Sequence, residues 1–220
     1  MLDIRLYISK TGNMKYVSHL DMFRLMQRAV RRADIPLWYT EGFNPHPYIS
    51  FLQALPLGVE SEREPCDIKI TEEISPDEIK NRLNAVMPGN FRIVNAVVPF
   101  NKPAEIRYSG FEFVFTPDVI TADELEKALS SGALTCEKQG KSGRQKIMRE
   151  INVSEHIPTF KTETDENGET RLNVTVSAGT AFNLSPGNLL DALSRFTGRE
   201  IKADRIKRTG FLCENFAAFE

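Results

Sequence analysis

Residues 18–36 read SHLDMFRLMQRAVRRADIP and predict one amphipathic helix. Ser18 is suited to the N-cap, with Asp21 at the third helical position, and Pro36 sets the end of the helix. At 100° per residue the apolar side chains fall within one sector. This sector, which predicts the buried side, comprises Met22, Leu25, Met26, Ala29 and Ala33, and is widened by Phe23 and Val30.

Around this helix the first half of the chain alternates strands and helices in the order β-α-β-β-α-β, which is the ferredoxin-like arrangement. Apolar and polar residues alternate in the first strand, and the second helix has a Ser75 N-cap followed by Pro76. The predicted strands are residues 2–10, 49–59, 65–71 and 91–100, with a short extended piece at 37–40, and the second helix is 75–87.

The second half repeats this order after a polar, proline-containing linker at residues 101–107. Asn167-Gly168 predicts the turn of a hairpin, and Ser185-Pro186 repeats the helix start seen at Ser75. The fold class predicted for the chain is α+β, with two tandem ferredoxin-like sandwiches at 1–102 and 103–220. The second-half elements are strands at 108–116 and 203–212, helices at 121–132 and 185–198, a strand-turn-strand unit at 133–153 and a hairpin at 162–178.

Composition narrows the classes of function. The 220 residues are 41% hydrophobic and carry a net charge of −2, so nucleic-acid binding would have to depend on local basic patches. Cys66, Cys136 and Cys213 form no CxxC pair, which predicts neither a disulfide framework nor a zinc site. No metal and no cofactor are therefore predicted. The chain has no secretory signal pattern and no apolar run of membrane-spanning length, so we expect a cytoplasmic protein.

The polar side of the first helix carries four arginines and no lysine. Guanidinium groups match phosphate geometry and stack on bases, so this face is a candidate RNA-binding surface. The alternative is an ordinary solvated face, with Asp21 near Arg24 and Asp34 near Arg31. Further basic clusters occur at Lys138, Lys141, Arg144, Lys146 and Arg149, and at Lys202, Arg205, Lys207 and Arg208. The four arginines of the helix are Arg24, Arg28, Arg31 and Arg32.

The sequence GFNPHP at residues 42–47 predicts a stiff loop. Asn44 and His46 each precede a proline, which favours extended backbone and leaves little conformational entropy to lose on binding. Phe43 and Tyr48 either anchor the loop or offer a stacking surface. The alternative is a proline-rich crossover whose polar groups satisfy their own backbone. We expect the loop to bind, and we include Phe43, Asn44, His46 and Tyr48 among the candidate RNA contacts.

Two histidines are candidates for catalysis. His19 lies in the first turn of the basic helix, and a pair with His46 would be suited to general acid–base cleavage of RNA through the 2′-hydroxyl. Common catalytic signatures such as GxSxG, the P-loop, GxGxxG and HExxH do not occur in the sequence. Enzymatic activity is therefore uncertain, and a binding role is favoured.

Four motifs resemble the radical-SAM-linked domain family, a bacterial family of unknown function. They are Ser18-His19-Leu20-Asp21, the Arg28–Ala33 segment, Gly42–Pro47 and Leu55–Ser61. The resemblance implies that the partner is a cobalamin-binding radical SAM protein. It also implies that the gene lies near genes for RNA and ribosome metabolism. Because this chain has no radical SAM cysteine triad, it would be the accessory part.

Three functional hypotheses follow. The first is an accessory module that binds structured RNA, either tRNA or rRNA, and presents it to a radical SAM RNA-modifying enzyme. The second is a metal-independent ribonuclease that uses His19 and His46. The third is a protein-interaction adaptor for a radical SAM partner. The tandem layout is also similar to CRISPR-RNA-processing endonucleases and to pseudouridine synthases, by analogy of fold alone.

Overall fold

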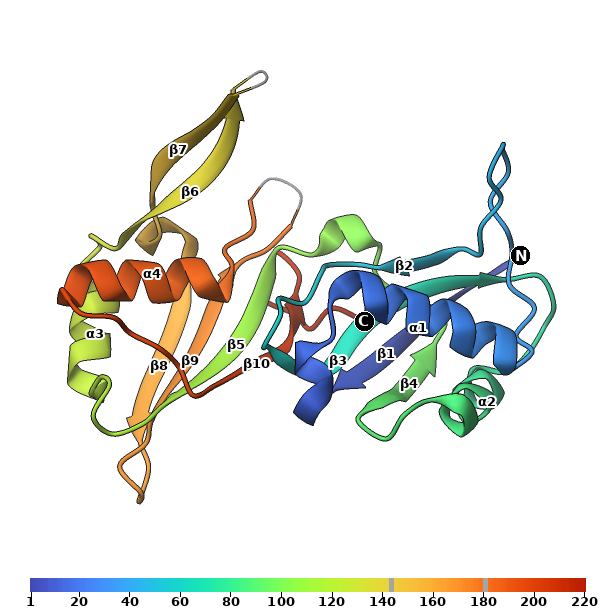
Figure 1. Ribbon diagram of the computed structural model, residues 1–220, viewed down its shortest axis with the longest axis horizontal. Helices are drawn as coiled ribbons and strands as arrows, with labels where there is room; N and C mark the ends of the chain where they lie inside the picture. Colours follow the sequence, from blue (N-terminus) through green and yellow to red (C-terminus); the bar gives the residue numbers. More distant parts are fainter. Residues whose placement is uncertain (143–144, 180–181) are drawn as a thin grey trace. The chain divides into compact units, whose positions relative to one another are not determined.

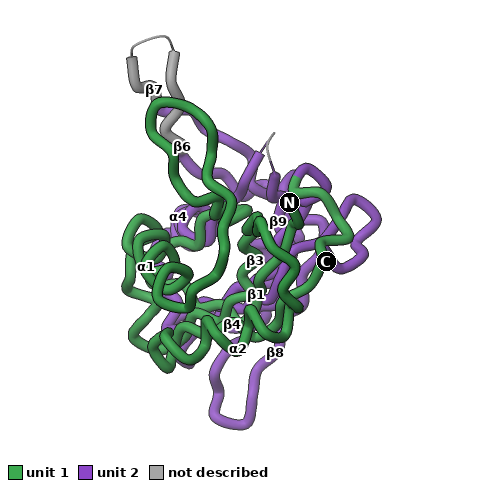
Figure 2. Tube along the Cα trace, turned by 90° about the vertical axis from the view of Figure 1, so that its right-hand side faces the viewer, with its two compact units in different colours: residues 1–103, 220 green, residues 104–219 purple. Residues whose placement is uncertain are grey.

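The computed structural model describes residues 1–142, 145–179 and 182–220, of which 138–142 and 145–147 are described by their backbone alone. The chain divides into two compact units, which Figure 2 distinguishes by colour. Unit 1 comprises Met1–Pro103 together with Glu220, and unit 2 comprises Ala104–Phe219. Helices and antiparallel strands occur in both units, so the predicted α+β class is confirmed.

Unit 1 follows the predicted β-α-β-β-α-β order (Figure 1). Within its sheet the strands lie in the order β4-β1-β3-β2, and each neighbouring pair is antiparallel. Leu6 at the centre of β1 lies opposite Cys66 on one side and Ala96 on the other. The elements are β1 (Leu2–Lys10), the 3-10 helix η1 (Gly12–Tyr16), α1 (His19–Arg32), β2 (Ile49–Phe51), β3 (Glu60–Ile70), α2 (Pro76–Val86) and β4 (Phe91–Val97).

Both helices of unit 1 pack on the same face of the sheet. The predicted apolar side of α1 is buried at Met22, Met26 and Ala29, and α2 contributes Ile79 and Leu83 to the same core. Burial of these apolar side chains is the main force that holds the helices on the sheet. The strands supply alternate residues to this core, including Ile4, Leu6 and Ile8 of β1 and Cys66, Ile68 and Ile70 of β3.

Both helices start at the predicted capping residues, whereas α1 ends at Arg32 and not at Pro36 as predicted. The Ser18 hydroxyl oxygen accepts a hydrogen bond from the Asp21 backbone N–H, and Ser75 accepts one from Glu78, each at 3.2 Å. These bonds satisfy backbone donors that the first helical turn leaves without partners. The chain leaves α1 through Asp34, whose φ of 52° is in the left-handed region. The predicted N-caps of both helices are confirmed.

The predicted strand at residues 49–59 is wrong. Only Ile49–Phe51 pairs in register with β3, with one further bond from the Leu52 N–H to the Pro65 carbonyl at 3.2 Å, and the chain then turns near Pro56. Pro56 has no N–H for a strand ladder, and Gly58 has a φ of 82° that ends extended structure. A turn bond from the Val59 N–H to the Pro56 carbonyl, at 3.3 Å, closes this corner before β3 begins at Glu60.

Unit 2 has a sheet of strand order β10-β5-β9-β8, again antiparallel throughout. It departs from a four-strand repeat because β6 and β7 form a separate hairpin, which extends away from the sheet of its own unit (Figure 1). The elements are β5 (Tyr108–Phe115), α3 (Ala122–Ser130), β6 (Thr135–Ser142), β7 (Gln145–Asn152), η3 (Ser154–His156), β8 (Thr159–Thr164), β9 (Thr170–Ser177), α4 (Pro186–Thr197) and β10 (Arg205–Leu212), with η2 (Pro103–Glu105) between the units.

None of the helices described combines the length and the apolar character needed to cross a bilayer. No group of three or more histidine, cysteine or acidic side chains is gathered to hold a metal ion in the same part of the chain.

Candidate nucleic-acid interface

The polar side of α1 presents its arginines to solvent. Because Met22, Met26 and Ala29 face the sheet, all four arginines of the helix are exposed. Arg24, Arg28 and Arg32 are spaced four residues apart, so they form a row with steps of about 6 Å along the helix axis. The predicted basic face therefore exists as a continuous surface on one helix.

This row borders a groove with a volume of about 390 Å³. Arg24, Arg28 and Arg32 line it together with Asp21, whereas Arg31 is outside the lining. The remaining lining is apolar and comes from α1, from the segment before it and from the end of α2: Val17, Leu25, Ala29, Val86 and Pro88. The groove thus combines cationic side chains with an apolar wall.

At one end of the groove the positive charge of Arg24 is neutralised by Asp21. An Asp21 carboxylate oxygen lies 3.1 Å from Arg24, and the other accepts a hydrogen bond from the Ser18 hydroxyl at 2.7 Å. The pKa of Asp21 is below its ordinary value, first because of the Ser18 bond and then because of Arg24. Asp21 is therefore ionised at neutral pH and neutralises Arg24.

The other three arginines have no such partner. In the described part of the chain no ion pair or hydrogen bond involves the side chain of Arg28, Arg31 or Arg32. The predicted interaction of Arg31 with Asp34 is not formed between the side chains: the Asp34 backbone N–H still donates to the Arg31 carbonyl at 3.3 Å, but its φ of 52° takes the Asp34 side chain out of the helical row. These three exposed guanidinium groups can therefore bind an anion from outside the chain.

The GFNPHP loop is closed by its own polar groups. Tyr39 pairs with Pro47 as an isolated bridge, and the Thr40 N–H donates to the His46 carbonyl at 2.9 Å. The His46 Nδ1 lies 3.0 Å from the Thr40 hydroxyl and 3.1 Å from the Asn44 carbonyl. The loop projects from unit 1 between α1 and β2 (Figure 1). His46 thus fixes the loop conformation.

The two aromatic residues of the loop differ in exposure. Phe43, next to a Gly42 with a φ of 128°, is fully exposed. Tyr48 is half-buried beside Trp38, with 6.0 Å between ring centroids, and the Lys69 ammonium lies 5.1 Å from the Tyr48 ring. Tyr48 therefore anchors the loop, whereas Phe43 is available for contact with a ligand or a partner.

The structure does not bring the two candidate catalytic histidines together. The His19 ring packs edge-on against Phe51 at 5.5 Å, whereas the His46 ring contacts Thr40 and Asn44. Five residues of extended chain between His46 and Phe51 cover about 16 Å. Neither histidine lines the α1 groove. No contact joins the two rings in the portions of the chain that the structure describes.

Sequence reasoning missed Val17, just before α1, and two distant residues of the groove, Val86 and Pro88. The latter two lie about 60 positions after α1 in the sequence and reach it only because α2 packs beside α1 on the sheet. No local pattern marks them. They look in the sequence like the ordinary end of a helix.

The other two predicted basic clusters provide less support for an anion-binding surface. In the last strand Arg205 pairs with Glu169 at 3.0 Å, and Arg208 is buried with its guanidinium over the rings of Phe111 and Phe211. In the cluster at the strand-turn-strand unit, the side chains of Lys138, Lys141, Arg144 and Lys146 lie outside the described residues.

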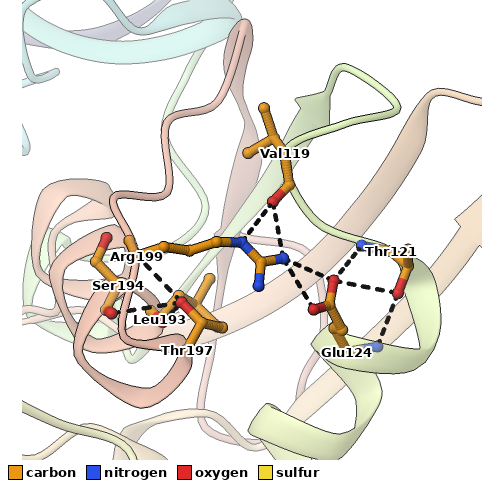
Figure 3. A network of polar contacts seen from close by, with 7 residues as sticks. All are labelled: Val119, Thr121, Glu124, Leu193, Ser194, Thr197 and Arg199. Carbon is orange, nitrogen blue, oxygen red and sulfur yellow. Dashed lines mark hydrogen bonds and ion pairs between the residues drawn. The ribbon is translucent and has the colours of Figure 1, made fainter.

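Arginines near α4 in unit 2 are engaged by carboxylates. Figure 3 shows Arg199, whose guanidinium lies 2.8 Å from both Glu124 oxygens and also donates to the Val119 carbonyl. Glu124 in turn forms a capping box with Thr121 at the start of α3. Arg199 therefore ties the region after α4 to the first turn of α3.

The antiparallel sheets covered by helices define an α+β protein with an arginine-lined groove. The chain belongs to the DUF2344 family, whose description is an uncharacterized protein conserved in bacteria and whose family model matches residues 3–186. The comparison with curated proteins gave no match.

A solved structure shares the fold. A chain in the crystal structure of a Cbf5-Nop10-Gar1 complex matches with a TM-score of 0.53 and 8% sequence identity. The match covers 94% of this chain and 48% of that chain, so this chain spans about half the length of the protein it matches. At this identity the likeness concerns the fold alone.

Proposed function

We propose that this protein is an accessory RNA-binding module of a radical SAM RNA-modifying system. The observation that carries the proposal is the exposed arginine face of α1, where Arg28, Arg31 and Arg32 have no ion-pair partner among the described residues. Unpaired guanidinium groups bind phosphate well because they are charged at all relevant pH values and donate in a fixed fork. The ligand would be tRNA or rRNA.

The radical SAM part of the proposal depends on the sequence motifs. Ser18–Asp21 and Gly42–Pro47 resemble the radical-SAM-linked domain family, and the same two segments border the arginine helix and form the projecting loop. In this proposal the loop residues Asn44 and His46 contact a ribose or a base, and Phe43 stacks on one. The protein would present RNA and would not itself react.

The proposed architecture is two ferredoxin-like domains. The strand orders β4-β1-β3-β2 and β10-β5-β9-β8 support it, because each places the first and third strands of a β-α-β-β-α-β unit at the centre of its sheet. Unit 2 would then carry the β6–β7 hairpin as an insertion. That residues 1–102 and 103–220 fold as separate domains stays a prediction.

The test is the binding of labelled tRNA and rRNA fragments, measured by fluorescence anisotropy between 50 and 250 mM KCl. We expect affinity to fall as salt rises. Arg28→Glu and Arg31→Glu should each weaken binding by about tenfold, which corresponds to the loss of one charged hydrogen bond. Lys161→Glu, the same charge change on the exposed β8 residue, is the control and should have little effect. Salt-independent binding, or none, would refute the proposal.

One observation favours a second candidate, a protein-interaction adaptor. Phe43 is fully exposed on a loop that His46 and Thr40 hold closed, and a rigid aromatic anchor is typical of protein interfaces. A pull-down of the radical SAM partner that survives nuclease treatment and fails with Phe43→Ser would support the adaptor. The ribonuclease alternative has no comparable support, because His19 and His46 make separate contacts.

A further inference from the structure

The groove along α1 has an apolar wall that binding of a phosphate group alone would not require. Beside its three arginines it has an apolar wall that includes Leu25, Ala29 and Val86. A duplex presents phosphates to a protein while its bases remain paired and stacked, so a duplex would leave this wall in contact with water. An unpaired base has a free flat face that such a wall can cover.

The size of the groove suits one nucleotide. Its volume of about 390 Å³ falls near the lower end of the range of small-molecule pockets, which begins at about 300 Å³. A double helix is too wide to enter a groove of this volume and could only lie across the opening. A single nucleotide of a strand can enter.

The distribution of charge along the groove favours one orientation of a bound nucleotide. Asp21 lies among the arginines at the start of the row, where its carboxylate repels phosphate and accepts hydrogen bonds from hydroxyl or amino groups. Arg28 and Arg32, farther along α1, form no ion pair among the residues described, and only the more distant charge of Asp21 acts on Arg28. The phosphate side of a nucleotide therefore fits Arg28 and Arg32, and the sugar or base edge fits Asp21.

We propose that the α1 groove binds one unpaired nucleotide of single-stranded RNA, with the base against Leu25 and Val86 and the phosphate at Arg28 and Arg32. This inference rests on the proposed RNA-binding function and deepens it by naming the class of RNA. It also assigns base contact to the groove, in addition to the loop.

The experiment compares an unstructured labelled RNA decamer with the same sequence in a blunt duplex, using the full chain. We expect the single strand to bind at least tenfold more tightly. Leu25→Ala should weaken single-strand binding about fivefold without changing its salt dependence, because it removes apolar contact and no charge. Arg28→Ala should lower the slope of log affinity against log salt by about 0.7.

Controls separate this inference from the function on which it depends. Arg31→Ala, on the same helix but outside the groove, should weaken the single strand and the duplex by the same factor, whereas Arg28→Ala should weaken the single strand more than the duplex. Val86→Ala repeats the test of the wall from α2 if circular dichroism shows that Leu25→Ala disturbs folding.

Three results would overturn the inference. The inference would be refuted if the duplex bound as tightly as the single strand or more tightly and Leu25→Ala did not change the affinity. If binding still depended on salt and on Arg28, the proposed function would remain intact. A nucleoside 5′-monophosphate that binds as tightly as the decamer would show that the groove is a mononucleotide site. If neither RNA binds at all, the proposed function fails and the inference fails with it.

Discussion

The arginines of α1 in unit 1 and those around α4 in unit 2 are set in different surroundings. Arg199 is held by Glu124 at 2.8 Å, and Arg195 lies 3.3 Å from both Glu137 and Asp191. Arg28 and Arg32 are also exposed, yet they have no acidic partner among the residues that the structure describes. The same residue type thus joins segments in unit 2 through ion pairs, whereas Arg28 and Arg32 of α1 form none.

This contrast also exists within unit 1. Arg5 is fully buried and forms two hydrogen bonds with Asp67, at 2.7 and 3.0 Å. An arginine that serves the fold is accompanied by carboxylates placed to receive it, because an unpaired buried charge would be costly. The absence of such partners along Arg28–Arg32 is what makes that row a candidate for an external anion.

The largest effect is expected for the double charge reversal Arg28→Glu, Arg32→Glu. RNA affinity should fall by about 100-fold, since two charged hydrogen bonds are lost. Thermal stability should fall only slightly, because no ion pair is lost and only the favourable charge of Arg32 at the helix C-terminus is reversed. Anisotropy titrations and thermal melts measure the two quantities. A double variant that melts at a lower temperature and still binds RNA would show that these arginines stabilise the fold and do not bind RNA.

A smaller effect is expected at the loop. Phe43→Ser should weaken RNA binding about fivefold, the cost of one exposed stacking contact, without changing the salt dependence. The measurement is the same titration at two salt concentrations. Unchanged RNA affinity, together with loss of the radical SAM partner in a pull-down, would instead assign the loop to protein contact.

The reverse pattern is expected for Arg199→Ala. Its pair with Glu124 is about half exposed, so solvent screening limits the loss, and Tm should fall by about 2 °C. RNA affinity should stay within twofold of the wild type. Calorimetry and anisotropy test this. A clear loss of RNA binding would show that unit 2 also contributes a phosphate site.

The smallest effect concerns acid stability. The pKa of Glu124 is below its ordinary value of 4.5, first because the Thr121 backbone N–H donates to it and then because of Arg199. The folded state therefore gains stability from the charged form above pH 4.5 and loses that stability as pH falls through the lowered pKa.

Glu124→Gln keeps a capping oxygen but removes the titration. The urea midpoint of this variant should fall less between pH 5 and pH 3 than that of the wild type. An identical pH dependence in both proteins would mean that the network of Figure 3 does not contribute to acid stability.

Much of the fold could be predicted from local patterns. The N-caps Ser18 and Ser75, the apolar side of α1 and the order of elements in unit 1 follow from periodicity and capping chemistry. The strand at 49–59 could not, because its apolar run resembles a strand while Pro56 and Gly58 turn the chain.

The candidate site was only half visible in the sequence. Helical spacing gave the row of arginines, but the groove also needs Val86 and Pro88, which tertiary packing brings to α1. The sequence also left open whether His19 and His46 share a site. Their side chains instead contact Phe51 and Thr40, respectively, because the loop and the helix start project from different ends of β2.

The most direct test of the central claim is the salt dependence of single-stranded RNA binding in the wild type and in Arg28→Ala, Arg32→Ala. If the groove arginines neutralise phosphates, the slope of log affinity against log salt should lose about 1.4 in the double variant, at about 0.7 for each arginine. A slope that is the same in both proteins would contradict the account.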